Sequence, residues 1–217
     1  MQAQPLAKSA ILMLLIVFTA VISWELYLRN KGVTKAYDDG PPLWSHKRAM
    51  VYDPADKATV FIGSSRIKYD LDIDTWQTIT GEKPIQLAVE GSSPLPVLED
   101  LAKDENFKGK LIIDITEPVF FSPAAPRDAI TRSSINYFKE RTPSQKASFV
   151  LNNALESQLV FPEKDYFSLN AMLDNLEIPS RKGVFMMPVF PVDFNRNTFD
   201  RQSKMSDRFL KDTTLQN

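Results

Sequence analysis

The chain has 217 residues, enough for one α/β domain with a sizeable core and a short appendage. Its 26 basic and 27 acidic residues are finely mixed and give a net charge of −1, which argues against a nucleic-acid partner. The sequence has no cysteine and a single histidine, His46, which excludes disulfides, thiol catalysis and a zinc site built from cysteine and histidine.

The N-terminus carries the longest apolar run. Residues 9–28 are interrupted only by Glu25, and this length is about what a helix needs to cross a bilayer. Trp24 and Tyr27 stand where aromatic residues anchor at a membrane surface. A cleaved signal peptide, with Lys8 as its basic start, is the alternative, but the run is long and lacks an obvious cleavage site. We therefore predict a tail over residues 1–8 and an uncleaved transmembrane anchor over 9–28.

A connector rich in proline and glycine follows the anchor, over residues 29–57. It contains a short amphipathic piece that we expect to pack against the domain. His46 lies in this piece between Ser45 and Lys47, and in such a basic setting we expect a solvated rather than a catalytic histidine. The domain itself is predicted over residues 58–217.

Three short apolar runs alternate with helical patterns at the start of the domain. The runs are residues 60–62, 84–91 and 109–117. The first crossover contains a helix that Asp72 or Asp74 caps and Gly81 ends, and the second begins with a cap at Ser92 or Ser93. This alternation predicts a parallel sheet with right-handed crossovers, the three-layer flavodoxin-like class of α/β fold.

Polar residues follow all three runs. They are Gly63-Ser64-Ser65-Arg66 after the first run, Glu90-Gly91-Ser92 after the second, and Thr116-Glu117 within and at the end of the third. Parallel strands end at one edge of a sheet, so these residues predict a ligand site there. Arg66 suits a carboxylate or a phosphate, by paired hydrogen bonds.

Metal and nucleotide sites are not predicted. The spacing of Asp70, Asp72 and Asp74 resembles a calcium loop, but Thr75 and Gly81 stand where such a loop needs glycine and glutamate. We therefore assign these aspartates to helix capping. The glycine patterns of a P-loop and of a dinucleotide site are absent, and no cofactor is predicted.

The second half of the chain is mainly helical in pattern. Helices are expected over residues 129–141, 142–159 and 166–176, a strand over 183–190 and a further helix over 204–210. Thr142, Pro143 and Gln145 form a capping-box start for the second of these helices. Its apolar stripe, which includes Val150 and Leu151, is expected to face the core. Such a sheet usually has more strands than the sequence supplies, so the domain is expected to be incomplete.

The strand followed by Gly63-Ser64-Ser65, together with Gly91 after the second strand, resembles the SGNH/GDSL hydrolase family. The resemblance covers roughly residues 58–122. It implies that Ser65 is the nucleophile, with Ser64 in place of the family's aspartate, and that the backbone N–H groups of Ser65 and Gly91 form the oxyanion hole. The residues that follow the three strands, Ser64, Arg66, Ser92, Thr116 and Glu117, are the candidate substrate contacts at this edge.

Two features depart from the family. The asparagine block after the third strand is replaced by Asp114-Ile115-Thr116-Glu117, although Thr116 can partly substitute as a donor. The family's Asp-x-x-His near the C-terminus is also missing, and His46 lies before the first strand. A serine hydroxyl is a poor nucleophile without a base, so little turnover is expected of this chain.

The apolar run predicts a single-pass membrane protein, and the resemblance implies that it acts on an acylated glycan or another ester. The resemblance implies that the domain is extracytoplasmic. The positive charges flanking the anchor favour the opposite orientation slightly, since Lys8 precedes it and Arg29, Lys31 and Lys35 follow it. The alternative is a non-catalytic, membrane-tethered binding or assembly module with the same fold.

Overall fold

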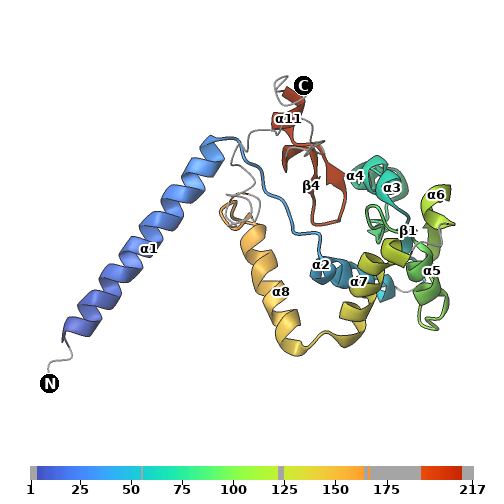
Figure 1. Ribbon diagram of the computed structural model, residues 1–217, viewed down its shortest axis with the longest axis horizontal. Coiled ribbons are helices and arrows are strands. Elements are labelled where there is room, and N and C mark those ends of the chain that lie inside the picture. Colours follow the sequence, from blue (N-terminus) through green and yellow to red (C-terminus); the bar gives the residue numbers. More distant parts are fainter. Residues whose placement is uncertain (1–3, 55, 122–124, 164–165, 167–191, 212–217) are drawn as a thin grey trace, which may run out of the picture.

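The computed structural model describes residues 4–54, 56–121, 125–163, 166 and 192–211 (Figure 1). The helices, with 3₁₀ helices marked η, are α1 (Gln4–Asn30), α2 (Pro41–Ala49), η1 (Met50–Tyr52), α3 (Ser65–Asp70), α4 (Ile73–Thr80), α5 (Leu95–Ala102), α6 (Glu117–Phe120), η2 (Ala125–Asp128), α7 (Ala129–Glu140), α8 (Pro143–Glu156), η3 (Val192–Phe194) and α11 (Asp207–Lys211). The strands are β1 (Thr59–Ile62), β2 (Ile85–Gln86), β3 (Lys110–Ile113), β4 (Arg196–Asn197) and β5 (Ser203–Lys204). The helix expected over 166–176, apart from Tyr166, and the strand expected over 183–190 lie outside the described residues.

A small parallel sheet forms the centre of the domain. Within the described residues it has the order β2-β1-β3, and β1 pairs in parallel with both neighbours. The predicted mixed α/β class with parallel strands is therefore confirmed. The strands are shorter than the apolar runs, although Leu87 and Val89 still donate to the carbonyls of Phe61 and Gly63, at 2.8 and 3.2 Å.

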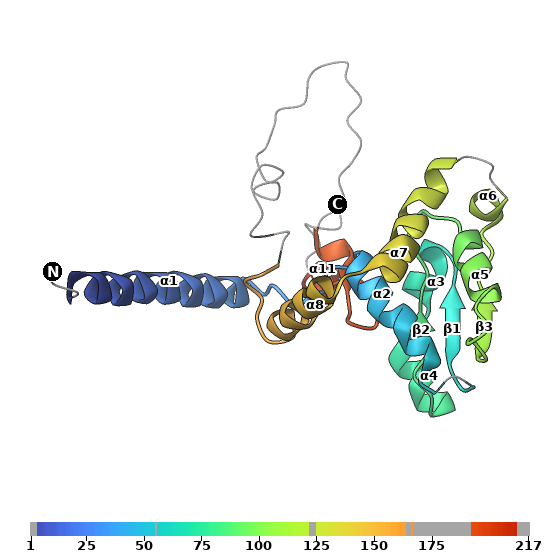
Figure 2. The ribbon, with the colours of Figure 1, turned by 90° about the horizontal axis from the view of Figure 1, so that it is seen from below.

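Helices cover both faces of this sheet (Figure 2). Val60 and Ile62 point to one face, where they join a buried cluster with residues of α2, α5 and α7. Trp44 of α2 is completely buried in this cluster and donates to the carbonyl of Leu87, at 3.0 Å. Phe61 points to the other face and meets Trp76 of α4 edge to face, at 5.0 Å between ring centroids. The connector thus supplies core residues, as its amphipathic piece predicts.

Local capping signals predict several helix ends correctly. The Asp72 carboxylate accepts from the N–H of Thr75 at 2.9 Å, and Gly81 ends α4 in the left-handed conformation. Thr142 and Gln145 form the expected reciprocal capping box at the start of α8.

Two predictions about the second half are wrong. The apolar stripe of α8 does not face the core, because Val150, Leu151 and Leu155 are all exposed. The helix expected from Lys204 begins at Asp207 instead, since Lys204 belongs to the antiparallel hairpin of β4 and β5. Ser206 caps that helix, as its hydroxyl accepts from the N–H of Phe209 at 3.0 Å.

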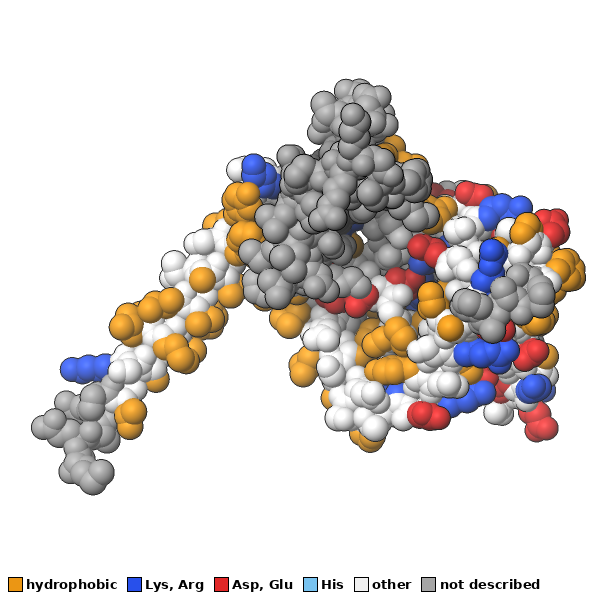
Figure 3. All heavy atoms as spheres, in the orientation of Figure 1, with side chains coloured by type: hydrophobic (Ala, Val, Ile, Leu, Met, Phe, Trp, Pro, Cys, Tyr) orange, Lys and Arg blue, Asp and Glu red, His pale blue; other side chains and the backbone are white. Residues whose placement is uncertain are grey.

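Helix α1 is long and apolar enough, over Leu6–Asn30, to cross a membrane. Its most apolar stretch is not buried in the domain. Figure 3 shows hydrophobic side chains along this helix, which projects away from the rest of the molecule. The geometry is therefore consistent with a membrane anchor.

The last turns of α1 are fastened to the domain. The buried Glu25 carboxylate accepts from the N–H groups of Val160 and Phe161 at 2.9 and 2.7 Å, just after α8. Leu28 of α1 packs with Val33 and Val160 in a small buried cluster of its own. The end of the anchor helix is thus part of the folded structure.

Replacing Glu25 with alanine is expected to loosen this junction. The amide hydrogens of Val160 and Phe161 would lose their acceptor, and a hydrogen bond to a charged group contributes about 1.5–3 kcal/mol. We expect these two amides to exchange with deuterium roughly tenfold faster or more, as read by mass spectrometry of the full chain in detergent. The control is Glu105→Ala, which removes an exposed carboxylate far along the chain. If the amides of Val160 and Phe161 exchanged at the same rate in both variants, Glu25 would not hold the end of α1 to the domain.

Candidate functional site

The chain segments after β1, β2 and β3 meet at one edge of the sheet. Gly63 accepts from the N–H of Val89 at 3.2 Å, and the N–H of Asp114 donates to the carbonyl of Ile62 at 2.9 Å. A Cβ atom on Gly63 would lie 2.9 Å from Cβ of Asp114 and 2.6 Å from Cγ2 of Ile67, so no other residue fits there without displacing its neighbours. Glycine therefore lets the three segments approach closely.

Ser64 and Ser65 follow this glycine but differ in their surroundings. Ser64 is buried at the N-cap of α3, without a side-chain capping bond. Ser65 is exposed at the first position of α3, and its hydroxyl makes no hydrogen bond to another described residue. At this position a backbone N–H has no partner within the helix. Ser65 thus offers both a free hydroxyl and an N–H at the sheet edge.

Gly91 lies at the same edge, after β2. It is exposed and has a φ of 63°, a left-handed conformation that glycine adopts readily. No atom lies within 4 Å of the place where its Cβ would stand, so the space beside it is open. The neighbouring Ser92 is buried instead, and its hydroxyl donates to the carbonyl of Glu90 at 3.3 Å. Of these two residues, Gly91 is therefore the accessible one.

Arg66 is held by the segment after β3. Its guanidinium donates to Oδ1 of Asp114, at 2.9 Å from Nε and 2.5 Å from Nη2, and to the carbonyl of Ile115 at 2.8 Å. The other carboxylate oxygen of Asp114 and the Thr116 hydroxyl are buried without a described partner. Glu117 is exposed at the start of α6. Arg66, which the sequence predicts to bind an anionic ligand, is therefore already paired with Asp114. Its side chain is nevertheless 53% exposed.

Three candidate bases, His46, Lys68 and Tyr69, make no described hydrogen bond to Ser65. The ring of His46 lies against Phe149 and Phe199, at 5.0 and 5.5 Å between ring centroids. Burial lowers the pKa of His46, helped by the positive charges of Lys47 and Arg141. His46 is thus half-buried among aromatic rings rather than solvated as expected, and no described hydrogen bond links it to the sheet edge.

Lys68 and Tyr69, on α3, are the other two candidates. Lys68 follows Ser65 by one helical turn, a Ser-x-x-Lys spacing known from serine enzymes, but its ammonium is ion-paired with Asp39 and Glu90. Burial, with the nearby Glu90 carboxylate, raises the pKa of Tyr69 to about 12, so this phenol keeps its proton.

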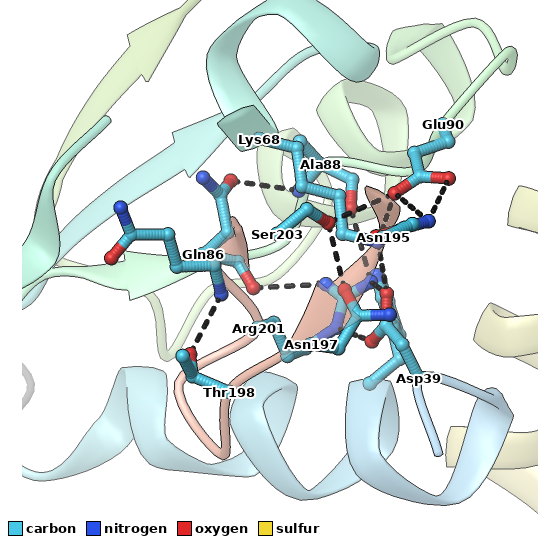
Figure 4. A network of polar contacts seen from close by, with 12 residues as sticks. Asp39, Lys68, Gln86, Ala88, Glu90, Asn195, Asn197, Thr198, Arg201 and Ser203 are labelled. Atoms are coloured by element: carbon cyan, nitrogen blue, oxygen red, sulfur yellow. Dashed lines mark hydrogen bonds and ion pairs between the residues drawn. The ribbon is translucent and has the colours of Figure 1, made fainter. Parts of the chain in front are cut away.

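A buried ionic network lies directly behind this edge (Figure 4). Arg201, which is 1% exposed, donates to both carboxylate oxygens of Asp39, at 2.5 and 3.1 Å. It also donates to the carbonyls of Gln86 and Ala88, at 2.9 and 3.0 Å. Lys68 bridges Asp39 to Glu90. The network ties the connector, α3, the end of β2 and the β4–β5 hairpin together.

This network was not predicted from the sequence. Glu90 also accepts from Asn195 at 3.2 Å and from the hydroxyl of Ser203 at 2.9 Å, so it has partners from the hairpin as well. Burial alone would raise the pKa of Asp39, but Arg201 and Lys68 outweigh it and lower the pKa. The network thus fixes Glu90, the residue before Gly91, in place.

The described residues contain no group of three or more histidine, cysteine, aspartate or glutamate side chains arranged to hold a metal ion. A cavity of about 140 Å³ lies between α2, α7 and α8, and its lining does not include Ser65 or Gly91. We therefore place the candidate site by its strand ends rather than by this cavity. Comparison with family models, with curated proteins and with solved structures found no match.

Proposed function

We propose that this protein is a membrane-anchored serine ester hydrolase or acyl transferase of the SGNH/GDSL type, with Ser65 as its nucleophile. The observation that supports it is the exposed Ser65 hydroxyl at the first turn after the central strand, with Gly91 at the same edge. In this proposal the order β2-β1-β3 is the beginning of a flavodoxin-like, three-layer sheet.

The proposed chemistry is acyl transfer through a covalent intermediate. Oγ of Ser65 attacks the ester carbonyl, and the N–H groups of Ser65 and Gly91 stabilise the negative charge on its oxygen. The carbon–oxygen bond to the alcohol then breaks, and the acyl group passes from Ser65 to water or to a second alcohol. In this proposal Ser65 supplies the nucleophile, and Ser65 and Gly91 supply the oxyanion donors. Turnover requires, in addition, a base that takes the Ser65 proton.

A fluorophosphonate probe on the full chain in detergent tests this proposal. Oxyanion donors typically contribute about 10²–10³ in rate, so Ser65 is expected to react roughly a hundredfold faster than an ordinary exposed serine. Ser133 on α7 is such a serine, and mass spectrometry of the labelled peptides compares the two sites. Ser65→Ala should lose the fast labelling and Ser133→Ala should keep it. If Ser65 reacts no faster than Ser133 in the folded chain, the enzyme proposal is overturned.

A non-catalytic binding module is the second candidate. It is favoured by the surroundings of two candidate bases, since His46 packs against aromatic rings and Lys68 is ion-paired. In that case the same edge binds a ligand without bond cleavage, and the fluorophosphonate experiment gives no preference for Ser65.

We further propose that the domain lies on the extracytoplasmic side of a single-pass anchor, where surface glycans carry ester-linked acyl groups. Because the chain has no cysteine, an Ile79→Cys variant would carry a single thiol on an exposed site of α4. A membrane-impermeant maleimide should label it in intact cells. Labelling only after the cells are lysed would place the domain inside.

A further inference from the structure

Helix α8 carries its apolar residues on the outside. Val150 and Leu151 are 63% and 67% exposed, and Leu155 is 46% exposed. Together with the exposed Ala147 and Ala154 they recur at spacings of three and four residues, so they share one side of the helix. An isolated exposed leucine needs no explanation, but a continuous apolar stripe indicates a contact surface.

The opposite side of α8 faces the domain and is mostly polar. Gln145, Asn152 and Glu156 line the cavity shared with α2 and α7, beside the half-buried ring of Phe149. This arrangement is the reverse of an ordinary surface helix, which buries its apolar side. The outward stripe is therefore not explained by packing within the described part of the domain.

The position of α8 relative to the anchor suggests what contacts the stripe. Its C-terminal end is held at the end of α1, where the carbonyls of Ser157 and Gln158 accept from Lys35 and Arg29, both at 2.8 Å. In Figure 1 both helices run downward from this junction, α1 toward the lower left and α8 toward the lower right. A bilayer around α1 would therefore face α8.

Charge supports the same contact. The exposed side chains of Arg29, Lys31 and Lys35 surround the junction, and Lys146 lies exposed near the other end of α8. Basic residues next to an apolar helix face favour the head groups of anionic lipids.

We propose that the outer side of α8 lies in the head-group region of the bilayer that α1 spans, so that the domain rests on the membrane instead of hanging from a tether. The proposal rests on α1 being a membrane span and is independent of the chemistry at Ser65. Interfacial helices bury their apolar side by about 5–10 Å at the boundary of head groups and acyl chains, a depth that Val150, Leu151 and Leu155 can fill.

Single-cysteine variants of the full chain test this contact, because the native sequence has no cysteine. A fluorophore is attached at Leu151→Cys, with one protein copy in each lipid nanodisc, and lipids with a quencher near the head group are introduced. Asn152→Cys, on the other side of the same helix, and Ile79→Cys, on α4, are the matched controls. Phe18→Cys, within α1, reports the anchor itself.

We expect the lipid quencher to reduce fluorescence several-fold more at Leu151 than at Asn152 or Ile79. Quenching at Leu151 no stronger than at Ile79 would overturn the proposal. So would a label at Leu151 that neither the lipid quencher nor a water-soluble quencher reaches, since another part of the chain would then cover the stripe. If the water-soluble quencher reaches Phe18, at the middle of the span, and a second lipid quencher placed on the acyl chains does not, α1 is not a membrane span and the proposal fails with that premise. The fluorophosphonate result on Ser65 does not depend on any of these outcomes.

Discussion

Replacing Arg201 with alanine is expected to lower the free energy of unfolding by about 3 kcal/mol, since removing one partner of a buried ion pair leaves the other charge uncompensated. The Asp39 carboxylate would keep only Lys68, and the carbonyls of Gln86 and Ala88 would lose a donor. Arg201 also has a φ of 65°, which alanine tolerates no better than arginine. The substitution therefore brings no compensating relief of the backbone.

The measurement is urea unfolding of the full chain in detergent, followed by tryptophan fluorescence, because Trp44 is buried in the core next to this network. Arg132→Ala is the matched control. It removes an exposed arginine paired with Asp128, and such surface pairs contribute at most about 1 kcal/mol. Arg201→Lys keeps the charge but not the planar fork, and should fall between the two. A loss in Arg201→Ala no larger than in Arg132→Ala would show that the hairpin does not depend on this contact.

The elements that sequence reasoning predicts correctly are those with local causes. The cap at Asp72, the glycine stop at Gly81 and the capping box at Thr142 each involve residues within a few positions of one another. The parallel sheet is also predicted, because short apolar runs alternate with helical patterns. The meeting of Gly63 with the segments after β2 and β3 then follows from strand direction alone.

The buried network could not be predicted in the same way. Asp39 and Arg201 are separated by 162 positions, and neither stands in a recognisable motif. The sequence around Asp39 indicates a polar connector, and the sequence around Arg201 indicates an exposed turn. Only the docking of the hairpin brings them together. Lys68 is different, since its spacing from Ser65 is visible in the sequence and could have been noticed.

The error at α8 has a physical cause of another kind. A helical stripe such as that of Val150 and Leu151 indicates an apolar contact but does not identify the partner. The prediction gives the core as the partner, whereas the face of the sheet that carries the main core is covered by α2, α5 and α7. For a chain with an apolar helix at its N-terminus, a lipid surface is a second partner that the same stripe fits.

The second large effect is expected at acidic pH and concerns Asp39. Burial alone would raise its pKa, but the positive charges of Arg201 and Lys68 outweigh burial and lower the pKa in the folded state. A carboxyl whose pKa is lowered by folding stabilises the protein while it is ionised. That stabilisation is present above the pKa of an unfolded aspartate, about 3.9, and is lost as the pH falls through the lower, folded pKa.

We therefore expect the stability of the wild-type chain to fall as the pH is lowered from about 4, and the slope to be shallower in Asp39→Asn. At neutral pH the variant should already be less stable, because Arg201 and Lys68 lose a carboxylate that both of them bind. Urea unfolding in detergent at a series of pH values measures both quantities. Asp128→Asn, which removes a partly exposed carboxylate, should leave the slope close to that of the wild type.

The slopes must be compared between variants, because Asp39 is not the sole acidic group with a lowered pKa. Burial alone would raise the pKa of Asp104 and of Asp200 as well. Hydrogen bonds from Tyr52 and Arg48 lower the pKa of Asp104 instead. Lys47 and Lys83 likewise lower the pKa of Asp200. These groups contribute equally to the wild type and to Asp39→Asn, so the difference between the two curves isolates Asp39. Parallel curves in the two proteins would mean that the connector is not held by Arg201 and Lys68. The hairpin would then be held near the edge where Ser65 and Gly91 lie by its contacts with Glu90 and with the carbonyls of Gln86 and Ala88, without the help of Asp39.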